Sequence, residues 1–266
     1  MKRSLLLLAA ALVASVSSAS AQDWAKARLD KSPRHLEWIT VKHDGREIGC
    51  YVAYPEVKDK ATAVIVIHEI FGLSDWARSV TDEFAEAGYI AIAPDLLWGL
   101  GAKGGGTSEL TSTEIGQKIR TLSADQITAD LNAVADYVTK LPAANGKLAV
   151  TGYCWGGGQG FRYVTNNPNL KAAFVFYGGP PATADLVRIK CPVYGFYGGN
   201  DARVTATVPK ATDDMKAAGK PYEATTYDGA GHGFMRSGED PGDQNPANKE
   251  AHDKAWVRLK EILGKL

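Results

Sequence analysis

The chain has 266 residues, with 30 basic and 30 acidic side chains, and 45% of its residues are hydrophobic. This length suits one large α/β domain, with two small domains as the alternative, and the hydrophobic fraction is ordinary for a globular protein. The balanced charge, with no basic stripe, argues against proteins that bind nucleic acid or anionic membranes through a charged surface. A substrate must therefore be inferred from a local site.

The first 21 residues have the pattern of a secretory signal peptide. Two basic residues precede a short apolar run over residues 5–16, and a small-residue motif ends at Ala21. An uncleaved anchor is the alternative, but the run is short for a bilayer span. We expect cleavage after Ala21 and an exported, periplasmic protein. No other segment approaches a transmembrane length, so we expect no stable membrane insertion.

Regular patterns begin after residues 22–36, which we interpret as a loose N-terminal arm. Residues 37–55 predict two alternating strands joined by Asp44-Gly45, a strong hairpin signal. Residues 62–68 form a β-branched run typical of a strand buried on both faces. Further along the chain, the predicted elements are a helix at 75–88, a strand at 89–96, a flexible glycine-rich loop at 99–108, a helix opened by a capping box at Ser123 and Gln126, a strand at 147–153, a helix at 155–166, strands at 172–179 and 192–199, a helix near 205–218, a strand at 222–229 and a helix at 248–264.

This alternation favours an α/β fold, with a mostly parallel sheet, helices on both faces and the antiparallel hairpin at the start. No internal repeat or linker is present, so we assign residues 37–266 to one domain. In such a sheet, functional groups gather at the carboxyl ends of the strands. Four turns there carry unusual chemistry, at residues 68–72, 152–158, 198–201 and 229–236.

The turn around Cys154 matches the strand–turn–helix nucleophile elbow of hydrolases, with cysteine in place of serine. Gly152 and Gly156 leave room for the bend, and the N-terminus of the following helix favours negative charge near the sulfur. A buried structural cysteine in a glycine-rich turn is the alternative interpretation. The other two cysteines of the predicted mature chain are Cys50 and Cys191, which we expect to be buried free thiols rather than a disulfide.

A thiol nucleophile requires a base, and the base requires an orienting group. The order Cys154, Asp201, His232 is the nucleophile–acid–histidine order of the α/β-hydrolase fold. Asp201 follows a strand and a glycine turn, and His232 lies between two glycines after the last strand. Asp228 is the alternative orienting acid, although it is close to His232 in sequence. His68 ends a strand and is a candidate supporting residue.

Taken together, the motifs "HEIFGL", "APDLL", "GYCWGGG", "GGND" and "GHGFMR" resemble those of the dienelactone hydrolase family of α/β-hydrolases. The resemblance runs from about residue 37 to the C-terminus, and the cysteine elbow combined with the "HEIFG" turn is its most specific part. It implies an enzyme that hydrolyses the lactone ring of 4-carboxymethylenebut-2-en-4-olide to maleylacetate. It also implies that neither a metal nor an organic cofactor is needed.

The resemblance assigns roles to further residues. It implies that Glu69 contacts the cysteine side of the site and helps to create the thiolate when substrate binds. It places the oxyanion hole at the backbone N–H groups of Ile70 and Trp155. It matches Arg236 to an arginine that binds the substrate carboxylate, a task that suits a guanidinium group. The family's other carboxylate-binding arginine is absent after "APDLL", where Trp98 and the loop at 99–108 are expected to form a more apolar or more open pocket.

Three functions follow as hypotheses. The first is a cysteine-dependent hydrolase of lactones and esters of the dienelactone type, and the second is a broad-specificity exported carboxylesterase on the same scaffold. The third is a catalytically inactive binding or accessory protein. In each case we expect a small-molecule ligand, no nucleic acid, and a monomer or small homo-oligomer. A zinc site at "HEIFG" is not indicated, because no second histidine follows at the required spacing.

Overall fold

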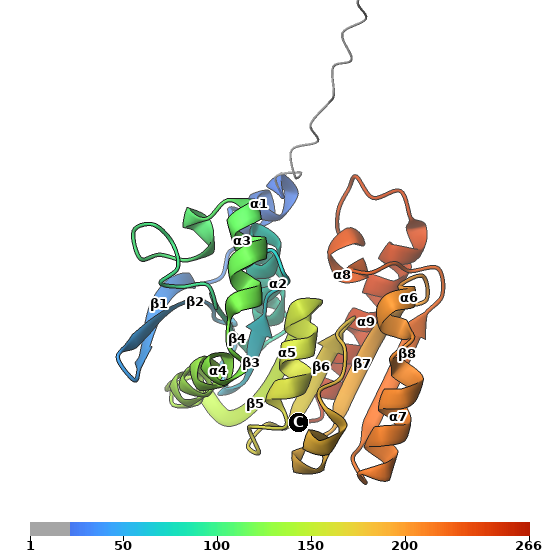
Figure 1. Cartoon of the computed structure of the whole chain (residues 1–266). Helices are drawn as coiled ribbons and strands as arrows, with labels where there is room; N and C mark the ends of the chain where they lie inside the picture. Colours follow the sequence, from blue (N-terminus) through green and yellow to red (C-terminus); the bar gives the residue numbers. More distant parts are fainter. Residues whose placement is uncertain (1–21) are drawn as a thin grey trace, which may run out of the picture.

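The computed structural model describes residues 22–266, and the predicted signal peptide at 1–21 lies outside the described residues. An eight-stranded sheet in the order β1-β2-β4-β3-β5-β6-β7-β8 forms the centre of the molecule (Figure 1). The strands are β1 (Leu36–His43), β2 (Arg46–Ala53), β3 (Ala61–Ile67), β4 (Ile90–Pro94), β5 (Ala144–Tyr153), β6 (Ala172–Phe176), β7 (Val193–Gly198) and β8 (Tyr222–Tyr227).

The pairing of the strands confirms a mostly parallel sheet with an antiparallel hairpin at its start. Strands β1 and β2 pair antiparallel, as do β2 and β4, and every other neighbouring pair is parallel. The hairpin turns at Asp44 and Gly45, whose φ angles of 46° and 74° are both positive. A two-residue turn of this kind matches the twist of the strands that it joins, which explains why the Asp-Gly pair predicted it.

Helices cover both faces of the sheet. The helices are α1 (Asp23–Leu29), α2 (Asp75–Glu86), α3 (Ser112–Lys118), α4 (Ala124–Thr139), α5 (Trp155–Tyr163), α6 (Ala202–Thr205), α7 (Val208–Ala217), α8 (Phe234–Ser237) and α9 (Pro246–Leu263). Helices α4, α5 and α7 lie in front of the sheet in Figure 1, with α2 and α9 behind it.

Strand β3 shows why its sequence is apolar throughout. Its residues alternate between two buried clusters: Ile65 and Ile67 pack with α4 on one side, and Val64 and Val66 pack with α2 and α9 on the other. All seven residues of the strand are buried. Burying both faces of a central strand in this way anchors its carboxyl end, from which the chain continues into His68 and Glu69.

Two of the predicted loop and helix features differ from the structure. The helix expected near 205–218 begins slightly later, as α7, and the short α6 before it was not predicted. The glycine-rich loop is held by hydrogen bonds rather than left free. Glu109 accepts hydrogen bonds from the backbone of Lys103 (2.9 Å) and Gly105 (3.2 Å), while Asp95 accepts from the backbone and the hydroxyl of Thr107. Asp95 and Glu109 lie outside the glycine-rich segment, so the composition of that segment alone did not indicate these hydrogen bonds.

The prediction of a loose arm at residues 22–36 is wrong. Residues 23–29 form α1, which packs against α2 and buries Ala25 completely. After it, Arg34 donates two hydrogen bonds, of 2.6 and 2.7 Å, to the buried carboxylate of Asp82. A charge-assisted pair of this kind is among the stronger side-chain contacts, and it ties the arm to the main body.

We expected no membrane-spanning helix after the predicted signal peptide, and free thiols at Cys50 and Cys191. Within residues 22–266, no helix combines the length and apolar character that a membrane crossing requires. Cys50 and Cys191 are buried free thiols, and Cys154 is free and half-buried. Burial raises the pKa of Cys191 to about 11 and the pKa of Cys50 further still, so neither of these two sulfurs carries a charge near neutral pH.

Candidate active site

The turn after β5 holds Cys154 in a strained conformation at the start of α5. Its φ and ψ angles are 54° and −116°, a region that side chains other than glycine rarely adopt. Glycines two positions on either side make the bend possible. A Cβ atom on Gly152 would lie 2.1 Å from the oxygen of Gly156, and one on Gly156 would lie 2.3 Å from the oxygen of His68. The sharp turn presents the Cys154 side chain at the edge of the sheet.

Three residues from distant parts of the chain meet at this edge. The Sγ atom of Cys154 lies 3.0 Å from Nε2 of His232, and Nδ1 of the same ring lies 2.5 Å from Oδ2 of Asp201. Asp201 is buried and also accepts a hydrogen bond from the backbone of Val204 at the start of α6, which fixes its orientation. Asp201, and not the exposed Asp228, therefore orients the histidine.

The surroundings of His232 favour its protonated form. The contact with the Cys154 sulfur, followed by the hydrogen bond to Asp201, raises the pKa of His232 to about 9, against the opposing effect of partial burial. A protonated imidazole beside a sulfur favours a thiolate–imidazolium pair. The N-terminus of α5 directly behind the cysteine also favours negative charge at this position.

The loop after β3 forms the opposite wall. His68 is fully buried, and burial lowers its pKa, so the ring is neutral. Its Nε2 accepts from the backbone of Leu96 (3.3 Å), so Nδ1 carries the proton and donates to the backbone oxygen of Glu69 (2.8 Å). The ring also stacks on Trp155 with centroids 5.5 Å apart. His68 thus joins the Glu69–Ile70 segment to the first residue of α5.

The predicted oxyanion donors lie at the same cavity as the thiol. Ile70, Cys154, Trp155 and His232 all line a cavity of about 540 Å³. Among the described residues, the backbone N–H groups of Ile70 and Trp155 donate to no protein group. Two free N–H donors, one at the N-terminus of α5 and one in the loop after β3, can stabilise negative charge on an oxygen atom.

Tyr177 was missed by the sequence analysis. It is buried, has a φ angle of 39°, and its ring meets that of His232 edge-on with centroids 5.0 Å apart. The signal was the segment "YGGPP", residues 177–181, directly after β6 at the same carboxyl edge of the sheet. The ring limits how far His232 can swing and so helps to keep it near Cys154.

Glu69 and Arg236 form a pair with each other. The Nε atom of Arg236 donates to Oε2 of Glu69 (2.9 Å), and the guanidinium group lies over the ring of Phe71, 5.3 Å from its centroid. Burial raises the pKa of Glu69, and Arg236 partly offsets that effect. In the structure the hydrogen-bond partner of Glu69 is therefore Arg236, whereas the hydrogen-bond partner of the Cys154 sulfur is His232. Arg236 lines a neighbouring pocket of about 430 Å³, not the cavity of the thiol.

Trp98 is not brought to the cysteine. It packs over Gly49 and against Trp38, with ring centroids 6.1 Å apart, and it lines a separate pocket of about 270 Å³ with Arg78 and Asp95. Trp98 is thus not among the residues that line the cavity of the thiol, and its expected part in a substrate pocket stays a prediction. Its position was inferred from the absence of an arginine after "APDLL", a pattern that does not indicate where the replacing side chain points.

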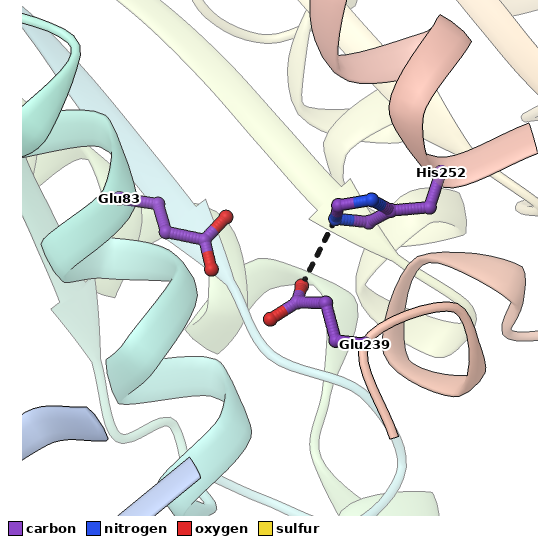
Figure 2. Close-up of side chains that lie close together, drawn as sticks. All are labelled: Glu83, Glu239 and His252. Atoms are coloured by element: carbon purple, nitrogen blue, oxygen red, sulfur yellow. Dashed lines mark ion pairs between the residues drawn. The ribbon is translucent and has the colours of Figure 1, made fainter. Parts of the chain in front are cut away.

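A second cluster of ionisable groups lies beside α2 and α9. Figure 2 shows Glu83, Glu239 and His252, and the His252 ring lies 3.2 Å from a carboxylate oxygen of Glu239. Each of the three side chains offers a ligand atom within 4.8 Å of the others. However, the guanidinium group of Arg28 already contacts Glu83 and lies 3.2 Å from Glu239. The chain thus supplies its own cation, and the cluster joins α1 to α2 and to the turn after α8.

Comparisons with known proteins identify the family of the chain. The sequence model described as "Dienelactone hydrolase family" matches residues 48–266. A protein of Salmonella typhimurium that carries the name carboxymethylenebutenolidase is 30% identical over 237 residues, covering 84% of each chain. A protein of the same name from Saccharolobus solfataricus is 30% identical over 253 residues, covering 83% of this chain and 95% of that one.

A solved structure shows the same similarity in three dimensions. The crystal structure of a protein from Klebsiella pneumoniae, titled as a dienelactone hydrolase, has a TM-score of 0.76 and 27% identity, and covers 88% of this chain and 99% of that one. The chain belongs to the dienelactone hydrolase family and has the α/β-hydrolase fold. It is a hydrolase that acts on esters or lactones.

Proposed function

We propose that the protein is a cysteine-dependent hydrolase of the dienelactone type, with Cys154 as nucleophile, His232 as acid and base, and Asp201 as the orienting acid. The single observation that carries this proposal is the 3.0 Å contact between the Cys154 sulfur and the His232 ring, whose other nitrogen is held by Asp201. The ring carbonyl of 4-carboxymethylenebut-2-en-4-olide is the proposed target, and maleylacetate is the proposed product.

The first half of the reaction makes a thioester. The Cys154 thiolate attacks the carbonyl carbon, and the electron pair of the carbonyl bond moves to oxygen, where the N–H groups of Ile70 and Trp155 stabilise the charge. When this intermediate collapses, the carbon–oxygen bond to the leaving group breaks. The proton on Nε2 of His232 passes to the departing oxygen. In a lactone, that oxygen stays attached to the acyl group.

The second half regenerates the thiol site. Acylation removes the hydrogen bond between His232 and the Cys154 sulfur, which is the first cause of the raised pKa of His232, so the neutral ring can act as a base in the thioester stage. It takes a proton from water, and the resulting hydroxide attacks the thioester carbon. The carbon–sulfur bond then breaks, releasing the carboxylic product and restoring the thiolate beside a protonated ring. Asp201 stabilises that ring in both halves.

A trapping experiment tests the proposal. Mature protein mixed with a 4-nitrophenyl ester and quenched within milliseconds is expected to gain the mass of one acyl group, and peptide mapping is expected to place it on Cys154. Cys50 and Cys191 serve as internal controls, because both are buried thiols. An unmodified Cys154 in protein that hydrolyses the ester would disprove the nucleophile assignment, and a protein that neither acylates nor hydrolyses would support an inactive accessory role.

The pH dependence of two ester types should differ. Below about pH 9 the His232 ring is protonated and can donate to a leaving alkoxide, and above that pH it loses this proton. We therefore expect kcat/KM for an ethyl ester to fall above about pH 9. For a 4-nitrophenyl ester we expect no such fall in kcat/KM above about pH 9, because its leaving group departs without a proton. After subtraction of the enzyme-free rate, a parallel decline for both esters would contradict the role of His232 as the acid.

A broad-specificity carboxylesterase is the second candidate, and one observation favours it. Arg236, the residue matched to a carboxylate-binding arginine, is bonded to Glu69 and lines a pocket other than that of the thiol. Equal kcat/KM values for the dienelactone and for neutral 4-nitrophenyl esters would support this candidate. We further propose that the protein is exported to the periplasm, on the pattern of residues 1–21.

A further inference from the structure

The peptide group between Glu69 and Ile70 supplies one of the two free donors of the site. Its N–H group belongs to Ile70, which lines the cavity of the thiol, and its oxygen belongs to Glu69. Among residues 22–266 no peptide bond is cis, and in a trans peptide the N–H and C=O groups point in opposite directions. Any contact that holds the Glu69 oxygen therefore also directs the Ile70 N–H group.

His68 is the side chain that holds this oxygen. Its ring is fully buried and neutral, because burial lowers its pKa, and Nδ1 donates to the oxygen of Glu69 (2.8 Å). The backbone N–H of Leu96 donates to Nε2 (3.3 Å), which leaves the single proton of the neutral imidazole on Nδ1. The backbone N–H of Gly72 donates to the same Glu69 oxygen (3.1 Å). Two donors thus fix the peptide group, and one of them comes from a ring that is itself held in place.

The same ring contacts the residue that supplies the second donor. It stacks on the ring of Trp155, with centroids 5.5 Å apart and planes only 16° from parallel. The backbones also meet, because a Cβ atom on Gly156 would lie 2.3 Å from the backbone oxygen of His68. Donors on two separate elements must be held at a fixed spacing if both are to bind one oxygen atom. His68 contacts both elements and is in a position to set that spacing.

We infer that His68 is a positioning residue for the oxyanion hole: its Nδ1–H holds the Glu69 oxygen, so that the Ile70 N–H is directed at the oxygen of the tetrahedral intermediate. A donor that is oriented before the reaction needs no reorganisation when charge develops. The hydrogen bond to Glu69 also polarises the peptide group and strengthens its N–H as a donor. His68 itself does not line the cavity. The inference rests on the proposed function and adds a residue to its machinery.

A matched pair of substrates tests the inference. One is a 4-nitrophenyl ester, and the other is the corresponding thionoester, in which sulfur replaces the carbonyl oxygen. Sulfur accepts hydrogen bonds weakly, so the two N–H donors stabilise charge on oxygen more than charge on sulfur. The readout is the kcat/KM of the ester divided by that of the thionoester, each relative to the rate constant for hydrolysis by hydroxide. Unfolded protein in a sample leaves this ratio unchanged, and we expect it to exceed one in the natural protein.

Two variants separate the hydrogen bond from the stacked ring. His68→Phe keeps a ring beside Trp155 but has no donor for the Glu69 oxygen. We expect it to reduce the ratio about tenfold, less than the cost of losing an oxyanion donor outright, because the Gly72 N–H still holds the peptide group. His68→Asn lacks the ring, but its amide N–H can occupy the position of Nδ1. This variant is expected to retain most of the ratio.

His43→Phe is the matched control. His43 is a histidine of β1 whose Nε2 atom lies 2.7 Å from a carboxylate oxygen of Asp130, and it does not line the cavity of the thiol. The same substitution there also removes a histidine hydrogen bond, but it leaves the Glu69–Ile70 peptide group untouched. We expect the ratio in this variant to equal that of the natural protein.

Three results would overturn the inference. They are a ratio of one in the natural protein, a ratio that is unchanged in His68→Phe, and equal losses in His68→Phe and His68→Asn. The last result would show that packing of the imidazole ring, and not its hydrogen bond to Glu69, is what matters. Failure of the proposed function gives a different result, because then neither ester would acylate Cys154 in the natural protein.

Discussion

Cys154→Ala is expected to lower kcat for a 4-nitrophenyl ester by roughly 10⁴-fold or more, as removal of a catalytic nucleophile does in related chemistry. The reason is geometric. Cys154 is the side chain in contact with Nε2 of His232 at the cavity that Ile70 and Trp155 also line. The other two cysteines are buried and cannot take its place. Steady-state kinetics on purified mature protein, with the rate corrected for hydrolysis by water, provides the measurement.

Cys154→Ser is the informative companion. The hydroxyl occupies the same turn, but it is not ionised by a nearby imidazole in the way that a thiol is. We expect a rate between those of the alanine variant and the natural protein. An alanine variant that retained the natural rate, in protein free of contaminating esterase, would refute the assignment of Cys154.

Gly152→Ala is expected to destabilise the fold by about 3 kcal/mol or more, which corresponds to roughly 10 °C in the unfolding temperature of a domain of this size. The added Cβ would lie 2.1 Å from the backbone oxygen and 2.5 Å from the backbone carbon of Gly156. Backbone atoms cannot rotate away as the end of a side chain can. Either the start of α5 moves or β5 does, and both movements displace the cysteine between them.

Gly158→Ala is the matched control, because it also lies in α5 but has space. The nearest atom to its added Cβ is 3.7 Å away, an ordinary contact distance. Alanine is the better helix former, so we expect a stability change within about 1 kcal/mol, in the stabilising direction. Thermal unfolding followed by circular dichroism measures both variants. Equal effects of the two substitutions would show that close approach at the elbow is not what requires glycine at position 152.

The sequence predicted those features whose cause is local. Asp44-Gly45 specified its hairpin because both positions need positive φ, and residues 62–68 specified a central strand because both of its faces are buried. The turns carrying Cys154, Asp201 and His232 were recognisable because each follows a strand at the same sheet edge. Parallel strands bring such turns together without further information, so the contact among these three residues could be anticipated.

What the sequence left undetermined depends on side chains that meet across long separations. Arg34 and Asp82 are 48 residues apart, and the Arg236–Glu69 pair spans 167 residues. Nothing near Arg236 indicates that its guanidinium group is bonded to Glu69. The arm at residues 22–36 contains no strong periodicity, and its order comes from contacts with α2. Trp98 shows the same limit, since the direction of one side chain is decided by packing against Trp38 and Gly49.

Arg28 connects α1, near the start of the described residues, to α2 and to the turn after α8. Arg28 neutralises Glu83 on α2 and Glu239 in the turn after α8, two carboxylates that are almost entirely shielded from water. A recombinant form that started after this residue would lose the guanidinium group between the two carboxylates and leave His252 as the remaining cationic partner, beside Glu239. The strain would be released by opening the turn just beyond Arg236. Any N-terminal truncation that keeps the fold intact is therefore expected to leave Arg28 in place.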